Sequence, residues 1–208
     1  MSSSKLVRWS GLASLAGGLL FIIHTVAESL VVEDRPLSEA AATSPWLVIE
    51  GGIVVTAVFV GFGLVGLYAR QAQRAGRLGL IAFVVAFIGV LLVTGSVWSE
   101  AFLAPWLART APELLDSGSA DSVLAAVWLS YLLFSLGWFL FGLASLRAGV
   151  LSRGAAILLL IGAVVPVVLG GLDIPLGSVL FGAALAWAGY ELWSGTADVP
   201  ASMAEAAA

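Results

Sequence analysis

The stretch GGLLFIIHTVAE, residues 17–28, places the only histidine of the chain and a carboxylate inside an apolar run. His24 and Glu28 are four residues apart, so on a helix they share one face, one turn apart. The surrounding residues 9–30 are long enough to cross a bilayer, since about 20 apolar residues span its hydrocarbon core. Ionisable groups are costly inside such a span, and this pair therefore indicates a functional site.

The composition of the chain is typical of an integral membrane protein. Of its 208 residues, 61% are hydrophobic and 11% are charged, and the mean hydropathy is +1.07. A soluble domain carries about 25% charged residues. The chain has no cysteine, which excludes disulfides, thiolate metal sites and cysteine nucleophiles. A single histidine also excludes a bis-histidine haem and the HExxH type of metalloprotease.

The apolar runs predict an all-α, polytopic helix bundle with six transmembrane helices in a single domain, residues 1–193. The predicted spans are residues 9–30, 45–69, 78–99, 122–146, 154–170 and 174–193. Residues 68–77 are predicted to connect the second and third spans. The stretch WLARTAPELL, in the polar segment after Glu100, is predicted to form a short amphipathic surface helix. Residues 194–208 are predicted to be a short polar, disordered tail.

Six spans place both termini on one side, and the distribution of cations predicts which side. If the N- and C-termini are cytoplasmic, only Arg35 and Arg109 lie outside. The inner cations are then Lys5, Arg8, Arg70, Arg74, Arg77, Arg147 and Arg153. This asymmetry is what the positive-inside rule requires. Most carboxylates lie toward the outer side, a separate bias because acidic residues do not set topology.

A short pattern occurs twice at the predicted cytoplasmic end of a span. Phe62-Gly63-Leu64-x-x-Leu67 recurs 79 residues later as Phe141-Gly142-Leu143-x-x-Leu146. One interpretation is a parallel internal repeat, in which spans 2-3 correspond to spans 4-5. The alternative is convergence, because apolar helices that end in arginine resemble one another.

The segment FGLASLRAGVLSRGAAILLLIGA, residues 141–163, resembles a recurrent motif of uncharacterised bacterial multi-pass membrane proteins, several of them grouped only as domains of unknown function. The resemblance covers about spans two to five. It implies a bacterial cytoplasmic (inner) membrane protein and assigns no functional residue.

Ionisable and aromatic side chains gather toward the predicted outer ends of the spans. With a helical rise of about 1.5 Å per residue, Glu50 lies about 7 Å inward from Pro45, at a depth similar to His24 and Glu28. These residues predict an outward-facing polar pocket, which Glu100 could cover. The candidate ligand-binding residues are His24, Glu28, Glu50, Glu100, Trp46, Trp128 and Tyr131. In the structural alternatives, His24 bonds a neighbouring helix, the glutamates are solvated and the aromatic residues form an interfacial belt.

Three classes of function remain open. The leading hypothesis is a protein that binds or translocates a cation, proton or small amphiphile through this pocket. The second is an intramembrane enzyme that modifies a lipid or isoprenoid with a protonated carboxylic acid such as Glu50. The third is an accessory or scaffold subunit whose main feature is its small-residue helix faces. Small residues spaced by four, such as Ser14 with Gly18 and Gly182 with Ala186, allow close packing of the first and last spans.

The expected partners follow from the same observations. They are the lipid bilayer, a small ligand or cation, and another copy of the chain or a partner membrane subunit. The sequence has no basic aromatic patch for nucleic acid and no glycine-rich phosphate loop with lysine. It specifies neither a cofactor nor a metal.

Overall fold

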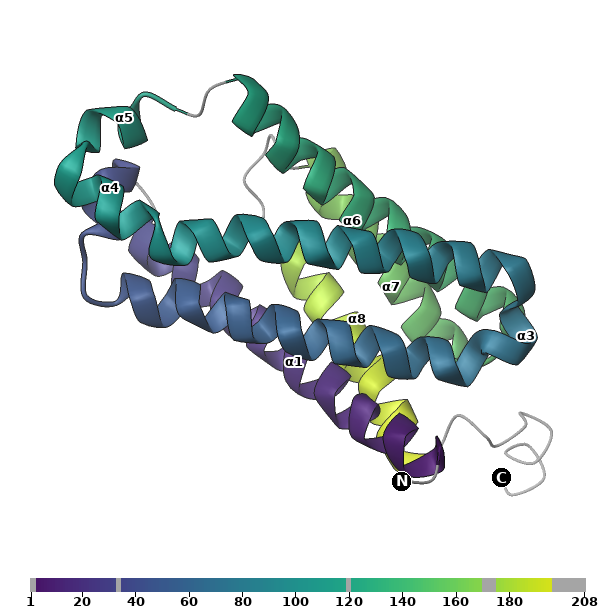
Figure 1. Ribbon diagram of the computed structural model, residues 1–208. Coiled ribbons are helices and arrows are strands. Elements are labelled where there is room, and N and C mark those ends of the chain that lie inside the picture. The colour runs from purple at the N-terminus through teal and green to yellow at the C-terminus, as the bar shows by residue number, and fades with distance from the viewer. Residues whose placement is uncertain (1–2, 33–34, 119–120, 170–174, 196–208) are drawn as a thin grey trace.

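The computed structural model describes residues 3–32, 35–118, 121–169 and 175–195. Within these ranges the secondary structure is helical and contains no strand (Figure 1), which confirms the predicted all-α fold. The long helices are α1 (Ser3–Val32), α3 (Trp46–Phe102), α6 (Asp121–Ala148), α7 (Arg153–Leu169) and α8 (Leu176–Ser194). The short helices are α2 (Leu37–Ala41), α4 (Ala104–Thr110) and α5 (Pro112–Asp116). The predicted disordered tail lies, from residue 196 on, outside the described residues.

Helix α3 reverses its direction at Gly76, where φ is 55° and ψ is −143°. Figure 1 shows its two parts, residues 46–75 (the first arm) and residues 77–102 (the second arm), running back along each other. The rings of Tyr68 and Phe83 stack across the arms with centroids 4.3 Å apart. The reversal falls inside the predicted connection, residues 68–77, but the turn is shorter than predicted because the residues before Gly76 are helical. Helix-forming residues continue the helix to the turn, and one glycine in a conformation with positive φ is enough to reverse it.

Small residues let α1 and α8 approach until their backbones touch. A Cβ atom on Gly182 would lie 2.7 Å from the carbonyl oxygen of Gly18, and one on Gly18 would collide with the carbonyl oxygen of Gly182. The hydroxyl of Ser14 donates to the carbonyl oxygen of Leu185 at 2.9 Å, which joins the same two helices. Close packing of the first and last long helices through small residues, as predicted, is confirmed.

The long helices form a closed ring in the order α1, first arm, second arm, α6, α7, α8. Contacts that join neighbours around this ring are Gly63 with Ser14, Gly89 with Phe134, Gly142 with Leu160 and Gly162 with Phe181. The buried rings of Trp138, Phe141 and Phe181 fill its centre. Gly63 and Gly142, which are equivalent in the proposed repeat, face different neighbours, α1 and α7. The internal duplication stays a prediction.

Among the described residues, three helical regions are long and apolar enough to cross a membrane, namely Lys5–Leu30, Trp46–Thr110 and Asp121–Ala148. The second of these contains the reversal at Gly76. Arg153–Pro166 is a shorter apolar helix. Together with the composition, these regions indicate a membrane protein.

The short helices pack together where the first arm begins and the second arm ends. Ala40, Ala41, Trp46 and Ala104 form a small core there. Asp116 accepts hydrogen bonds from the backbone N–H of Ser38 at 2.9 Å and from its hydroxyl at 2.6 Å. These two bonds stabilise the carboxylate and hold the pKa of Asp116 below its usual value. The stretch predicted as one amphipathic helix is in fact two, α4 and α5, with a break at Ala111.

Candidate functional site

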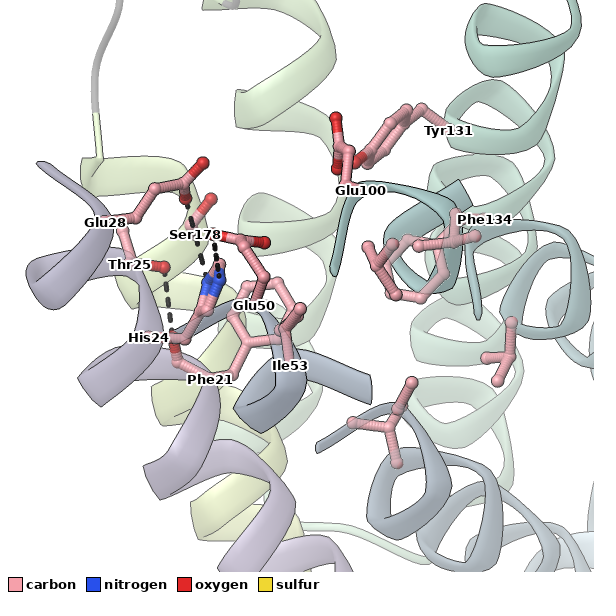
Figure 2. A pocket seen from close by; sticks show the side chains of 15 residues that line it. Phe21, His24, Thr25, Glu28, Glu50, Ile53, Glu100, Tyr131, Phe134 and Ser178 are labelled. Carbon is pink, nitrogen blue, oxygen red and sulfur yellow. Dashed lines mark hydrogen bonds and ion pairs between the residues drawn. The ribbon is translucent and has the colours of Figure 1, made fainter. Parts of the chain in front are cut away.

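A cavity of about 150 Å³ lies inside the helix ring and is lined by α1, both arms of α3, α6 and α8. Its chemically active side chains are His24, Glu28, Glu50, Glu100, Tyr131 and Ser178. Its apolar walls include Phe21, Ile53 and Phe134. Figure 2 shows His24, Glu28 and Glu50 together on one side of this acidic cavity, with Glu100 and Tyr131 on the other.

His24 lies between two carboxylates. Its Nδ1 atom is 3.7 Å from Oε2 of Glu28, one turn along α1, and its Nε2 atom is 3.4 Å from Oε1 of Glu50 in the first arm (Figure 2). The second contact exists because α1 and the first arm pack closely. A Cβ on Gly17 would lie 3.1 Å from the backbone nitrogen of Val60. The close packing of the two antiparallel helices brings His24 and Glu50 to the same level.

The carboxylates differ in their exposure to solvent. The side chain of Glu50 is 5% exposed and that of His24 12%, whereas Glu28 is 48% exposed. The buried Nε2 atom of His24 has no hydrogen-bond partner among the described residues. Its 3.4 Å separation from Oε1 of Glu50 is longer than the usual N–H···O hydrogen bond of about 2.7–3.2 Å. A carboxylate that leaves water needs compensating charge or hydrogen bonds. Imidazole supplies only part of this compensation to Glu50.

Glu100 and Tyr131 stand at the rim of the acidic cavity, and both are exposed. Glu100 is held by its backbone, because its carbonyl oxygen accepts a hydrogen bond from Nε1 of Trp46 at 3.2 Å. Trp46 itself is buried in the small core of α2 and α4. It therefore positions the rim without lining the cavity.

Trp128, the remaining candidate from the sequence, lines a second cavity of about 410 Å³ between α1, α6, α7 and α8. Tyr131, one turn further along α6, belongs to both cavities. The structure thus brings His24, Glu28, Glu50, Glu100 and Tyr131 to one cavity, places Trp128 in the adjoining one and Trp46 in neither. That these residues bind a ligand stays a prediction.

Two polar residues of the acidic cavity were not among the candidates. Ser178 comes from the first turn of α8 and lines both cavities. A hydroxyl at the start of an otherwise apolar helix is a weak signal, and only the packing of α8 against α1 gives it a place. Thr25 also lines the cavity, but its hydroxyl donates to the carbonyl oxygen of Phe21 at 3.0 Å, within its own helix.

The acidic cavity carries an excess of negative groups. Its 15 described lining residues include three glutamates and one histidine, and neither lysine nor arginine. Even a fully protonated His24 could balance only one of three ionised carboxylates. Within the described ranges, no group of three or more His, Cys, Asp or Glu side chains is placed so that it could hold a metal ion.

The fold and this cavity together define a class, a helical membrane protein with an acidic site inside its helix ring. No protein-family model matches the chain, and no curated protein and no solved structure shows significant similarity to it.

Proposed function

We propose that the chain crosses a bacterial cytoplasmic membrane six times, with cytoplasmic termini and an acidic cavity that opens on the outer side. The first arm of α3 is about 45 Å long and the second about 40 Å at a rise of about 1.5 Å per residue, and each is long enough to cross the hydrocarbon core. Helices α7 and α8 have 17 and 19 residues, within the range of transmembrane helices. Arg70, Arg74 and Arg77 flank the reversal at Gly76, at the end of the arms away from Glu50 and Glu100.

In this orientation, the function supported best is the binding, and exchange with the outer side, of a small organic cation or of protons. The observation that carries this proposal is the convergence of three glutamates and one histidine on a cavity whose described lining contains neither lysine nor arginine. The poorly solvated surroundings strengthen attraction between a carboxylate and a cation. The faces of Phe21, Phe134 and Tyr131 add a second attraction, since aromatic rings bind ammonium groups.

Thermal unfolding of the purified protein in detergent tests the proposal, with methylammonium as the probe and potassium at equal ionic strength as the reference. A ligand that binds the folded state raises the Tm as its concentration rises. We expect methylammonium to raise the Tm of the wild type more than potassium does. Glu50→Gln should weaken the response about tenfold or more in concentration, because hydrogen bonds to a charged group contribute about 1.5–3 kcal/mol.

The matched control is Glu113→Gln. Glu113 lies in α5, is exposed and does not line the acidic cavity, so this variant changes the net charge equally. It should keep the full response to methylammonium. An equal response of wild type and Glu50→Gln, or an equal loss in both variants, would contradict the proposal.

The two other functions that the sequence leaves open predict different results for the same purified protein. Conversion of a lipid species in a membrane extract by the purified protein would favour the lipid-modifying enzyme. Co-purification of a defined partner, with His24 and Glu50 freely replaceable, would favour the accessory subunit.

A further inference from the structure

The second cavity, which we call the apolar cavity, directly adjoins the acidic one. The two share Phe21, Tyr131, Phe134 and Ser178 as lining residues. The apolar cavity has the larger volume, about 410 Å³ against about 150 Å³. A ligand that passes the shared residues would therefore lie in two chemically different environments.

The lining of the apolar cavity is almost entirely hydrocarbon. It includes Leu124, Val127, Ala163 and Phe181, and its described lining contains no charged residue. Leu124 is 49% exposed, so the cavity reaches the outer surface of α6. In a bilayer this surface faces lipid, which gives a hydrocarbon chain a lateral path into the protein.

We propose that the ligand of this site is a cationic amphiphile, with an ammonium head in the acidic cavity and a hydrocarbon chain in the apolar cavity. This inference rests on the proposed function and names its substrate class. The head is assigned by charge, because the described lining of the acidic cavity has three glutamates and no cationic side chain except a protonated His24. Carboxylate or phosphate heads would be repelled there.

Two observations show that buried polar groups in the acidic cavity are incompletely hydrogen-bonded. The Nε2 atom of His24 is buried without a hydrogen-bond partner among the described residues. Glu50, 5% exposed, has the 3.4 Å approach of that same nitrogen as its polar contact. An ammonium group has several N–H donors and a full charge, and it can satisfy the Glu50 carboxylate at hydrogen-bond distance.

The hydrophobic effect is the reason for placing the hydrocarbon chain of the ligand in the apolar cavity. Moving one methylene from water into an apolar site strengthens binding by at most about fourfold. A chain that lies in the apolar cavity must therefore show affinity that rises with its length until the cavity is full. An ammonium ligand whose chain stays in water shows no such dependence, and one whose chain lies in the bilayer shows a dependence that filling the cavity does not change.

Equilibrium dialysis against the protein in lipid nanodiscs measures how affinity depends on chain length. Ligand bound by empty nanodiscs is subtracted, and the affinity is calculated from the free ligand concentration in water. The probes are methylammonium, hexylammonium and hexanoate. We expect hexylammonium to bind at least about tenfold more tightly than methylammonium, within the limit of about fourfold for each methylene. Hexanoate, which has the same chain length and the opposite charge, should not bind specifically.

Two variants fill the apolar cavity and leave the acidic one unchanged. Val127→Trp and Ser135→Phe both add a ring to residues that line the apolar cavity and not the acidic cavity. Either should reduce the advantage of hexylammonium over methylammonium to less than about threefold, because buried methylenes provide that advantage. Val123→Trp, one turn before Val127 and outside both linings, is the control and should keep the full advantage.

The outcomes separate this inference from the function on which it rests. Equal affinities for both amines in the wild type, or a chain-length dependence that survives both filling variants, would overturn the inference. The proposed function would then stand, provided that methylammonium binding still depends on Glu50. Binding of both amines that is unchanged in Glu50→Gln would overturn the two proposals together. Retained methylammonium binding shows that a filling variant is folded.

Discussion

Nε2 of His24 in α1 lies 3.4 Å from Oε1 of Glu50 in the first arm of α3. The two residues are on different helices, and the Glu50 side chain is almost fully removed from solvent. A buried carboxylate with one partner is vulnerable, because loss of the partner leaves its charge uncompensated.

His24→Leu should therefore lower the free energy of unfolding by about 1–3 kcal/mol, the cost of an unsatisfied buried polar group. The same substitution should cost much less in a Glu50→Leu background, where the buried carboxylate that needs compensation is absent and Glu28 is solvated. Denaturation in mixed micelles of the wild type, both single variants and the double variant measures the coupling, which should be about 0.5–3 kcal/mol. Additive effects would show that the two side chains do not interact.

The contact between α1 and α8 predicts a strong effect of a single methyl group. Gly18→Ala should lower the free energy of unfolding by about 1–3 kcal/mol, because the added Cβ collides with the backbone of α8 and forces the helices apart. Gly51→Ala is the matched control, since a Cβ at Gly51 would meet nothing within 4 Å. It should be neutral or stabilising by up to about 1 kcal/mol. Equal thermal stability of the two variants would contradict the packing described.

The reversal of α3 depends on the conformation of one residue. Gly76→Ala should destabilise the fold by about 1–3 kcal/mol, because a φ of 55° with a ψ of −143° is strained for any residue with a Cβ atom. Space does not limit this position, since no atom lies within 4 Å of the added Cβ. Gly95→Ala, in the second arm and equally open, provides the control and should not destabilise. A melting temperature unchanged in Gly76→Ala would show that the reversal does not need this conformation.

The bonds between Asp116 and Ser38 predict a local dependence on pH. The folded-state pKa of Asp116 is lowered from 3.8, so its contribution to stability is present above that value and is lost as pH falls through the lowered pKa. Hydrogen exchange at the Ser38 amide, corrected for its intrinsic pH dependence, should therefore accelerate in acid. In Asp116→Asn this additional acceleration should be absent, because the asparagine does not titrate. An acid response shared by both proteins would assign the effect to another group.

Much of the fold could be predicted from the sequence because long apolar helices are local structures. Residues 9–30 and 122–146 are apolar over the length of a span, and both lie within observed helices, α1 and α6. The shared face of His24 and Glu28 follows from helical periodicity alone, and the two side chains are 3.7 Å apart. Close packing also follows from the small residues Gly18 and Gly182, and their backbones touch in the structure.

Other features required the tertiary structure, because they depend on which helices are neighbours. The turn at Gly76 is shorter than predicted, since the polar residues before it favour helix as well as loop. Tryptophan is typical of the membrane–water interface, yet packing against α2 and α4 buries Trp46. The same packing order brings Glu50 to His24 and Ser178 to the wall shared by both cavities.

The sequence by itself determined an apolar, all-helical chain with an ionisable pair inside its first long helix. Hydrophobic composition and helical periodicity are properties of a single segment, so they can be read without knowing its neighbours. Only the tertiary structure decided that the carboxylates face a common cavity and that an apolar cavity adjoins it. Those relations depend on where backbones can touch, at Gly17 and Val60 or at Gly162 and Phe181. Close approach of two helices is a property of both surfaces together, so neither segment specifies it alone.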